Sequence, residues 1–351
     1  MSDDDALDLA LDELAAYGPD LRNGFTSHAP MVVEALTALG QPEAVLPWLE
    51  QYRPGLLPRP APRERITAPS WHEALGRPER AADWMRFMQG ELAEAPWRAV
   101  LVRWVARLAP AFCASATHGV LRVAHATRSL ARRETPQRVR ELGDALGAWA
   151  AEYQTLPAPA ERGRGGLAPA DAIVAVPVQP SAERRFRGSI VSALEGLSGF
   201  AAFAPVIDWI DVDGAPAPVV SALTHAFARV YLANARDALS TIVFVHGVTS
   251  AAALRSLLPY LDAALGRELV RYAWQAGAAL YASFATATPA PVAPAEPAPS
   301  REALVAAAVA NGDDHAIKFV EACLREHAEQ SDPIFLSAAA HALAALPPAR
   351  R

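Results

Sequence analysis

The chain has 351 residues, of which 52% are hydrophobic and 20% are charged, a composition that supports a buried core and excludes global disorder. A length of this order predicts one large helical domain or two closely packed ones. The formal net charge of -6 and the pI of about 5.9 argue against nucleic acid as a partner, because a negatively charged surface repels phosphate.

Most of the chain has apolar residues at spacings of three and four, the period of an amphipathic helix, and its many alanines favour helix throughout. The predicted class is therefore all-α, a single large multi-helix domain with proline-rich connectors. Two short runs rich in β-branched residues, 173–178 and 241–245, are compatible with strand as well as helix. In chain order, the predicted helices span residues 5–17, 30–39, 81–93, 97–108, 136–153, 219–238, 254–286, 301–310, 315–330 and 333–346.

Proline and glycine interrupt the helical pattern at three places. Residues 53–69 predict a long connector, residues 156–169 a surface loop, and residues 288–300, with their Ala-Pro repetition, a semi-extended linker. We expect a main helical domain over 1–287, the linker over 288–300, and a C-terminal helical hairpin over 301–351. Because roughly 50 residues are too few to bury a core alone, this hairpin should pack on the main domain and contribute to its functional site.

The cysteine content and the N-terminal segment favour the cytoplasm. Cys113 and Cys323 are the only two cysteines and cannot build a disulfide framework. The chain begins with Met1 and Ser2 followed by three aspartates, which is acidic where a secretory signal is basic. No run of about 18 uninterrupted apolar residues is present, so we expect a cytoplasmic protein with no membrane partner.

Lysine occurs once. Of the 32 basic residues all are arginine except Lys318, which follows His315 by three positions. A spacing of three places both side chains on one helical face, about 60° apart, as in the Glu-x-x-His pairs that offer two ligands to one metal in helical bundles. Arginine cannot replace lysine where an amine must lose its proton. A metal-binding role is therefore one reading of this pair, and a surface lysine beside a helix-start histidine is the other.

His118 and His125 are separated by seven residues, two helical turns, and so share a face about 10 Å apart along the axis. Two ligands of a mononuclear site would lie closer, so we expect one of them to bind a metal directly and the other to orient a ligand or line a pocket. Gly119, next to His118, permits a close approach between helices.

Three further histidines have settings that make them candidates. His246 lies in an apolar run, where an imidazole without a partner would cost on the order of 1–3 kcal/mol, so it should have a hydrogen-bond acceptor or a metal. His28 stands just before the predicted helix at 30–39, and His225 is a weaker candidate within 219–238. The remaining three histidines are interpreted as structural or exposed: His72, His327 and His341.

Several common enzyme motifs are missing from the sequence. It contains no Walker P-loop, no GxGxxG after a strand, no HExxH and no GxSxG. A flavin or nicotinamide bound through its own Rossmann domain is therefore not expected.

Four motifs, taken in order, resemble the questin oxidase-like family over roughly residues 10 to 345. They are Ser27-His28-Ala29-Pro30-Met31, His118-Gly119-Val120-Leu121-Arg122, His246-Gly247-Val248-Thr249 and His315-Ala316-Ile317-Lys318.

The resemblance implies an all-helical fold and oxidative chemistry with dioxygen on an aromatic or polyketide-like small molecule, of the Baeyer–Villiger or ring-cleaving kind. It also implies a non-heme iron held by histidines and a carboxylated lysine, with NADPH as a candidate external reductant. The ligands carried over to this chain are His28, His118, His246, His315 and Lys318. The chain departs from the family pattern at three positions near the presumed pocket, which puts the substrate in question: Ser27, Arg122 and His125. Arg122, His125 and His225 are kept as residues that orient a ligand or replace one.

The chemistry of such a site is coherent. Imidazoles suit zinc, copper, iron or nickel, and iron that works with dioxygen normally has an anionic oxygen ligand as well. A buried lysine has a depressed pKa, and its neutral amine can add carbon dioxide to form a carbamate, which would supply that oxygen donor. Aromatic residues could line the substrate pocket, although an aromatic is more often part of a core. The candidates are Trp71, Trp84, Trp97, Trp104, Phe227 and Trp274.

Two other functions fit the same residues. The first is a metal-dependent hydrolase, in which zinc or manganese activates water. The second is a helical binding protein without metal, whose histidines fill the core. Metal analysis of the purified protein would distinguish the three functions. Iron supports the oxygenase, zinc or manganese the hydrolase, and the absence of metal the binding protein.

Overall fold

The computed structural model describes residues 3–288 and 299–349, and the predicted all-α class is confirmed. The only sheet in these residues has two short antiparallel strands, β1 (Tyr17–Leu21) and β2 (Leu56–Pro58). Two compact units make up the chain, which we call the N-terminal unit, up to Gln154, and the C-terminal unit, Thr155–Ala349. The division falls beside residues 156–169, the stretch whose glycines and prolines predicted a loop.

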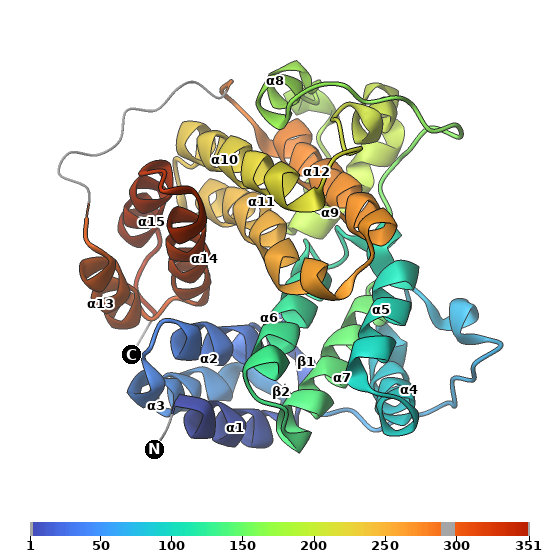
Figure 1. Ribbon diagram of the computed structural model, residues 1–351, viewed down its shortest axis with the longest axis vertical. Coiled ribbons are helices and arrows are strands. Elements are labelled where there is room, and N and C mark those ends of the chain that lie inside the picture. Colours follow the sequence, from blue (N-terminus) through green and yellow to red (C-terminus); the bar gives the residue numbers. More distant parts are fainter. Residues whose placement is uncertain (1–2, 289–298, 350–351) are drawn as a thin grey trace. The chain divides into compact units, whose positions relative to one another are not determined.

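The N-terminal unit contains seven α-helices, and α7 packs against both α4 and α6 (Figure 1). The helices are α1 (Asp3–Leu14), α2 (Ala29–Ala38), α3 (Pro42–Tyr52), α4 (Ala81–Glu94), α5 (Trp97–Leu108), α6 (His118–Arg132) and α7 (Pro136–Ala151). Short 3-10 turns occupy η1 (Arg53–Gly55), η2 (Trp71–Ala74), η3 (Pro78–Arg80) and η4 (Ala109–Ala111).

The close contact of α6 with α7 depends on Gly119, as the sequence predicted. A Cβ atom at Gly119 would lie 2.5 Å from Cδ1 of Trp149. The Trp149 indole is fully buried and donates a hydrogen bond of 2.8 Å to the carbonyl of Ala111. Because the ring is held by this bond, it cannot move aside, and only glycine fits in the first turn of α6.

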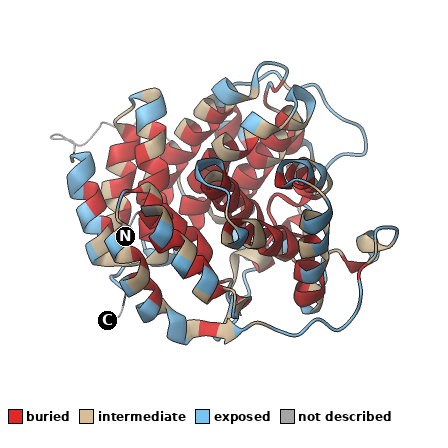
Figure 2. Ribbon diagram, turned by 60° about the horizontal axis from the view of Figure 1, so that its bottom comes forward, coloured by how far each residue is buried: buried red, intermediate tan, exposed pale blue. Residues whose placement is uncertain are grey.

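The C-terminal unit is built around α10 (Pro216–Asn234), α11 (Ala238–Leu257) and α12 (Ala263–Phe284), with α14 (Asp314–Gln330) packed against α11 (Figure 1). Helices with a buried side and an exposed side are seen in Figure 2, whereas α11 is exposed only at its first two residues, Ala238 and Leu239. The other elements are α8 (Pro169–Ala175), η5 (Ser181–Glu183), α9 (Ile190–Glu195), η6 (Gly196–Gly199), η7 (Ala201–Asp208), η8 (Leu258–Tyr260), α13 (Arg301–Asn311) and α15 (Ile334–Ala345).

Some predicted boundaries were wrong. The single helix predicted over 254–286 is two helices, because Pro259 lies in the turn η8 and the Asp262 side chain caps α12 by accepting from the amide of Leu265. The prediction for 219–238 merged α10 with the start of α11, which Asp237 caps. Residues 241–245 lie in α11 and residues 173–175 in α8, so neither ambiguous run is a strand.

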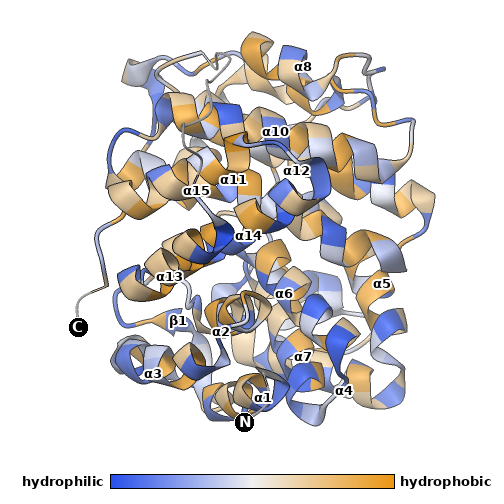
Figure 3. Cartoon of the chain, turned by 60° about the vertical axis from the view of Figure 1, so that its left-hand side comes forward, coloured by the Kyte–Doolittle hydropathy of each residue, from blue (hydrophilic) through white to orange (hydrophobic). Residues whose placement is uncertain are grey.

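After residue 299 the chain forms three helices, α13 to α15, and both α14 and α15 contact α10 and α11. Residues 289–298, most of the predicted linker, lie outside the described residues. One stretch, Ala238–Tyr260, is long and apolar enough to cross a membrane, and α11 is accordingly hydrophobic along much of its length (Figure 3). Of its apolar window, 78% is buried inside the structure, as expected for a core helix.

Candidate metal-binding histidines

His28 and His118 form a buried pair in the N-terminal unit. His28 is the residue before α2 and His118 is the first residue of α6, and these two helices pack together. Their rings are stacked, with centroids 4.5 Å apart and planes 22° apart. One ligand nitrogen of each ring lies within 4.8 Å of the other. The amide of His28 donates to the hydroxyl of Tyr52, which holds the start of α2.

The tautomer of His118 follows from its contact with the backbone. Its Nδ1 lies against the carbonyl oxygen of Ser115, three residues earlier. A carbonyl has no hydrogen to donate, so Nδ1 carries the proton and donates it. Nε2 is then the nitrogen with a lone pair, which is the state needed in a metal ligand.

The C-terminal unit holds a second pair, His246 on α11 and His315 on α14. The ring centroids are 5.5 Å apart and the planes 70° apart. Nδ1 of His246 donates to the carbonyl of Ile242 at 2.6 Å, which is the acceptor that its apolar setting led us to expect. Nδ1 of His315 lies 2.7 Å from Oδ1 of Asp314. In the neutral form of both rings, Nε2 then carries the lone pair.

Lys318 lies on α14 one turn after His315, and the predicted helical spacing is confirmed. Its side chain is buried, with 5% of the residue exposed. Burial lowers the pKa of its amine to about 8, although the nearby Asp314 and Asp313 carboxylates oppose this shift. Within residues 3–288 and 299–349 no hydrogen bond or ion pair reaches the amine. On the order of one tenth of the amine is therefore neutral at pH 7, far more than for an exposed lysine.

Asp313, Asp314 and His315 form a second group whose ligand atoms all lie within 4.8 Å of one another. Asp313 caps α14 by accepting from the amides of His315 and Ala316, each at 3.0 Å. Because Asp313 is committed to the cap and Asp314 to the imidazole, we interpret these carboxylates as orienting His315.

His125 and Arg122 make strong contacts of their own in the N-terminal unit. Nδ1 of His125 lies 2.6 Å from Oε2 of Glu34, which also binds Arg128. Burial alone would raise the pKa of Glu34, but Arg128 and His125 together hold it well below its usual range. Arg122 forms two hydrogen bonds, of 2.6 and 2.8 Å, with the buried Glu141.

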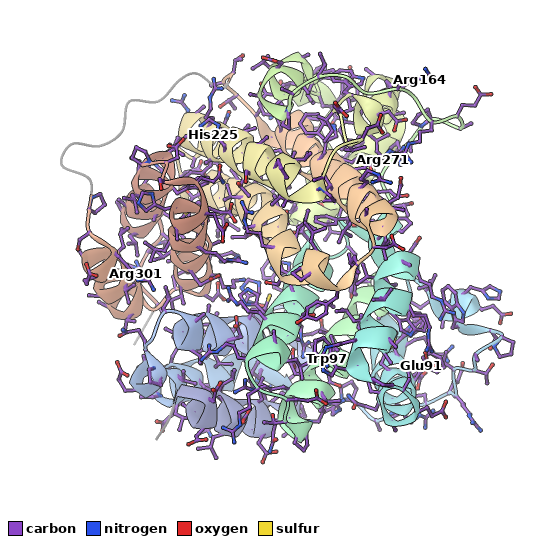
Figure 4. All side chains as sticks on the ribbon, viewed as in Figure 1. Glu91, Trp97, Arg164, His225, Arg271 and Arg301 are labelled. Atoms are coloured by element: carbon purple, nitrogen blue, oxygen red, sulfur yellow. The ribbon has the colours of Figure 1, made fainter. Side chains whose placement is uncertain are left out.

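A cavity of about 20 Å³ adjoins His118 and is lined by Asp20, Arg122 and Glu152 among others. That volume holds about one water molecule. A larger groove of about 860 Å³ in the C-terminal unit is lined by residues from three segments, within 162–165, 207–213 and 264–271. It includes Arg164 and Arg271 (Figure 4) but no histidine.

Three other histidines have local polar partners. His225, labelled on α10 in Figure 4, has a side chain 36% exposed, and its Nε2 lies 3.3 Å from Asp332. His341 accepts or donates a hydrogen bond of 2.9 Å with the Tyr231 hydroxyl, and His327 Nδ1 donates to the carbonyl of Asp332. His225 is therefore not part of the His246–His315 contact.

The aromatic residues proposed for a substrate pocket pack mainly with one another. In the N-terminal unit, Trp104 makes edge contacts with Trp71 and with Trp84. In the C-terminal unit, Phe227 stacks on Trp274 at 6.3 Å. These contacts are those of core aromatics.

Sequence reasoning missed the groups that orient the histidines. Asp314 could have been found, because an aspartate beside a histidine at a helix start is a visible pattern. The Ser115 carbonyl could not, because any residue has a carbonyl and only the backbone conformation directs it at His118.

No family model matches the chain, and no curated protein matches it either. The resemblance to the questin oxidase-like family therefore stays a prediction from the motifs. The structure itself supports a coarser statement, that a mostly helical protein carries buried histidines able to bind a metal ion.

Proposed function

We propose that the protein is a non-heme iron-dependent oxygenase acting with dioxygen on an aromatic or polyketide-like small molecule. The metal ligands in this proposal are His28, His118, His246, His315 and Lys318. The reaction class and the substrate class are inferred from the sequence resemblance. Metal binding is inferred from the geometry of the histidines.

The orientation of the imidazoles is the observation that carries the proposal. In His118, His246 and His315, Nδ1 donates to a carbonyl or a carboxylate, which leaves Nε2 as the acceptor. Metal-binding histidines almost always have this arrangement, because the outer hydrogen bond sets the tautomer and the ring orientation.

Lys318 fits the role of the oxygen-donating ligand. Its amine is buried, lacks a hydrogen-bond partner among the described residues, and has a pKa lowered to about 8. A neutral amine can add carbon dioxide, and the resulting carbamate is an anionic oxygen donor. Bound iron would supply the activation of dioxygen, while the chain would hold the ligands, exclude water and set the tautomers.

Metal analysis of the purified protein tests the proposal directly. We expect iron after a gentle preparation, with stoichiometric uptake of Fe²⁺ under anaerobic conditions in the presence of carbon dioxide. His246→Ala and Lys318→Arg should each lose this uptake while the helical circular dichroism signal is retained. His225→Ala is the control, because His225 is exposed and pairs with Asp332.

Other outcomes select another function. Zinc or manganese bound without dioxygen consumption would favour a hydrolase. Absence of any metal uptake would leave a helical binding protein. Equal uptake by wild type and Lys318→Arg would remove Lys318 from the ligand set. Two ions per chain would mean that each histidine pair binds its own ion.

A further inference from the structure

Three consecutive residues before α6 have left-handed backbone conformations. The φ angles of Ser115, Ala116 and Thr117 are 49°, 54° and 74°. None of the three is glycine, and positive φ is especially unfavourable for Thr117, whose β-branched side chain crowds its own backbone. Non-glycine residues visit this region singly rather than in runs. Such a run persists only where the surrounding structure holds it in place.

The same turn leaves α6 without a side-chain cap. Thr117 is the residue before α6, yet its side chain caps no amide, and its buried hydroxyl has no hydrogen-bond partner among the described residues. Thr135 stands at the matching position of α7, has a φ of -133°, and accepts a hydrogen bond from the amide of Arg138. The left-handed backbone thus costs α6 a contact that an identical residue makes on the neighbouring helix.

The turn directs the backbone carbonyl of Ser115 at the ring of His118. It points the oxygen of Ser115 at Nδ1 of His118 and accepts the His118 amide on the same oxygen, at 3.1 Å. The hydroxyl of Ser115 also bonds that of Thr26, at 2.7 Å, two residues before His28. The turn is therefore connected to both members of the stacked pair.

We infer that residues 115–117 are a strained positioning turn, which locks the tautomer and the ring orientation of His118 beside His28 before any metal is bound. Ala116 and Thr117 act as positioning residues through the Ser115 carbonyl. The inference rests on the proposed metal-binding function. A turn that merely connected two elements would use glycine here, because glycine adopts this conformation without strain.

The test replaces Thr117 by proline, whose ring holds φ at about −65° and excludes the left-handed conformation. In Thr117→Pro the Ser115 carbonyl should lose its contact with Nδ1 of His118, and the affinity for Fe²⁺, titrated anaerobically, should fall about tenfold or more, since the loss of an outer hydrogen bond typically has that effect. Ala116→Pro should behave in the same way and replaces Thr117→Pro if the latter does not fold. Thr117→Gly keeps the left-handed backbone without strain, so it should retain the wild-type affinity and have an unchanged or raised melting temperature.

Thr135→Gly is the matched control. It removes an ordinary cap in the same unit, so it should lower the melting temperature slightly and leave the Fe²⁺ affinity unchanged. Wild-type affinity in both Thr117→Pro and Ala116→Pro would overturn the inference.

A second readout does not depend on metal. In the metal-free wild type, nitrogen-15 spectra of the imidazoles should show His118 as a single tautomer protonated at Nδ1. In Thr117→Pro the signal should shift toward a mixture of tautomers. An unchanged His118 signal would overturn the inference, even if the wild type takes up no metal. Lack of metal uptake alone would instead refute the proposed function.

Discussion

The buried amine of Lys318 should make the metal-free protein less stable than a variant without it. Its pKa is lowered from 10.5 to about 8, a difference of 10.5 − 8 = 2.5 units. Each unit corresponds to about 1.4 kcal/mol, so keeping the charged amine buried costs on the order of 3 kcal/mol of folding free energy. Lys318→Met retains the length of the side chain and removes the charge. At pH 7 we therefore expect the variant to be more stable by an amount of that order.

The stability difference between the wild type and Lys318→Met should depend on pH. Below about pH 8 the amine is protonated in both the folded and the unfolded chain, so the full cost is present. Between about 8 and 10.5 the unfolded chain binds more protons than the folded one, and the stability of the wild type rises with pH. The advantage of Lys318→Met should thus shrink across this window and vanish above it.

Urea unfolding of metal-free wild type and Lys318→Met, in buffers without carbon dioxide from pH 7 to 10.5, measures this difference. Lys318→Arg is the control, because guanidinium stays charged throughout and should show no gain at high pH. A variant less stable than the wild type at pH 7, or a difference independent of pH, would refute the reasoning. Lys318 would then be a protonated lysine with a favourable environment.

Two further substitutions test contacts around the histidines. Gly119→Ala should destabilise the protein by about 1–3 kcal/mol, seen in thermal or urea unfolding, because its Cβ would lie 2.5 Å from the fixed Trp149 ring; an unchanged stability would show that α6 and α7 can separate. Asp314→Asn should weaken metal binding by about 10–100-fold in a competition titration, because the charge that orients His315 is lost; Asp332→Asn is the control, and equal affinities would contradict the assigned role.

Local patterning was sufficient for much of the fold. The helix at 97–108 was predicted at its observed bounds, because amphipathic spacing and the limiting Pro96 are both local signals. The same holds for the shared helical face of His315 and Lys318. Where two helices join without a strong apolar discontinuity, as at 258–262, periodicity ran through the break and the prediction was wrong.

The candidate ligands were identified from sequence, but their chemical state depends on tertiary structure. The carboxylate that contacts Nδ1 of His125 comes from Glu34, 91 positions away, which no local pattern predicts. The tautomer of His118 depends on a left-handed turn that no residue type in Ser115–Thr117 would predict. Helical periodicity arises from neighbours within a few residues, so the sequence alone determined the all-α class and the face that His315 shares with Lys318. Hydrogen-bond partners and backbone strain depend on the folded backbone and on contacts between segments, so only the folded chain decided which nitrogen of each ring faces its hydrogen-bond acceptor.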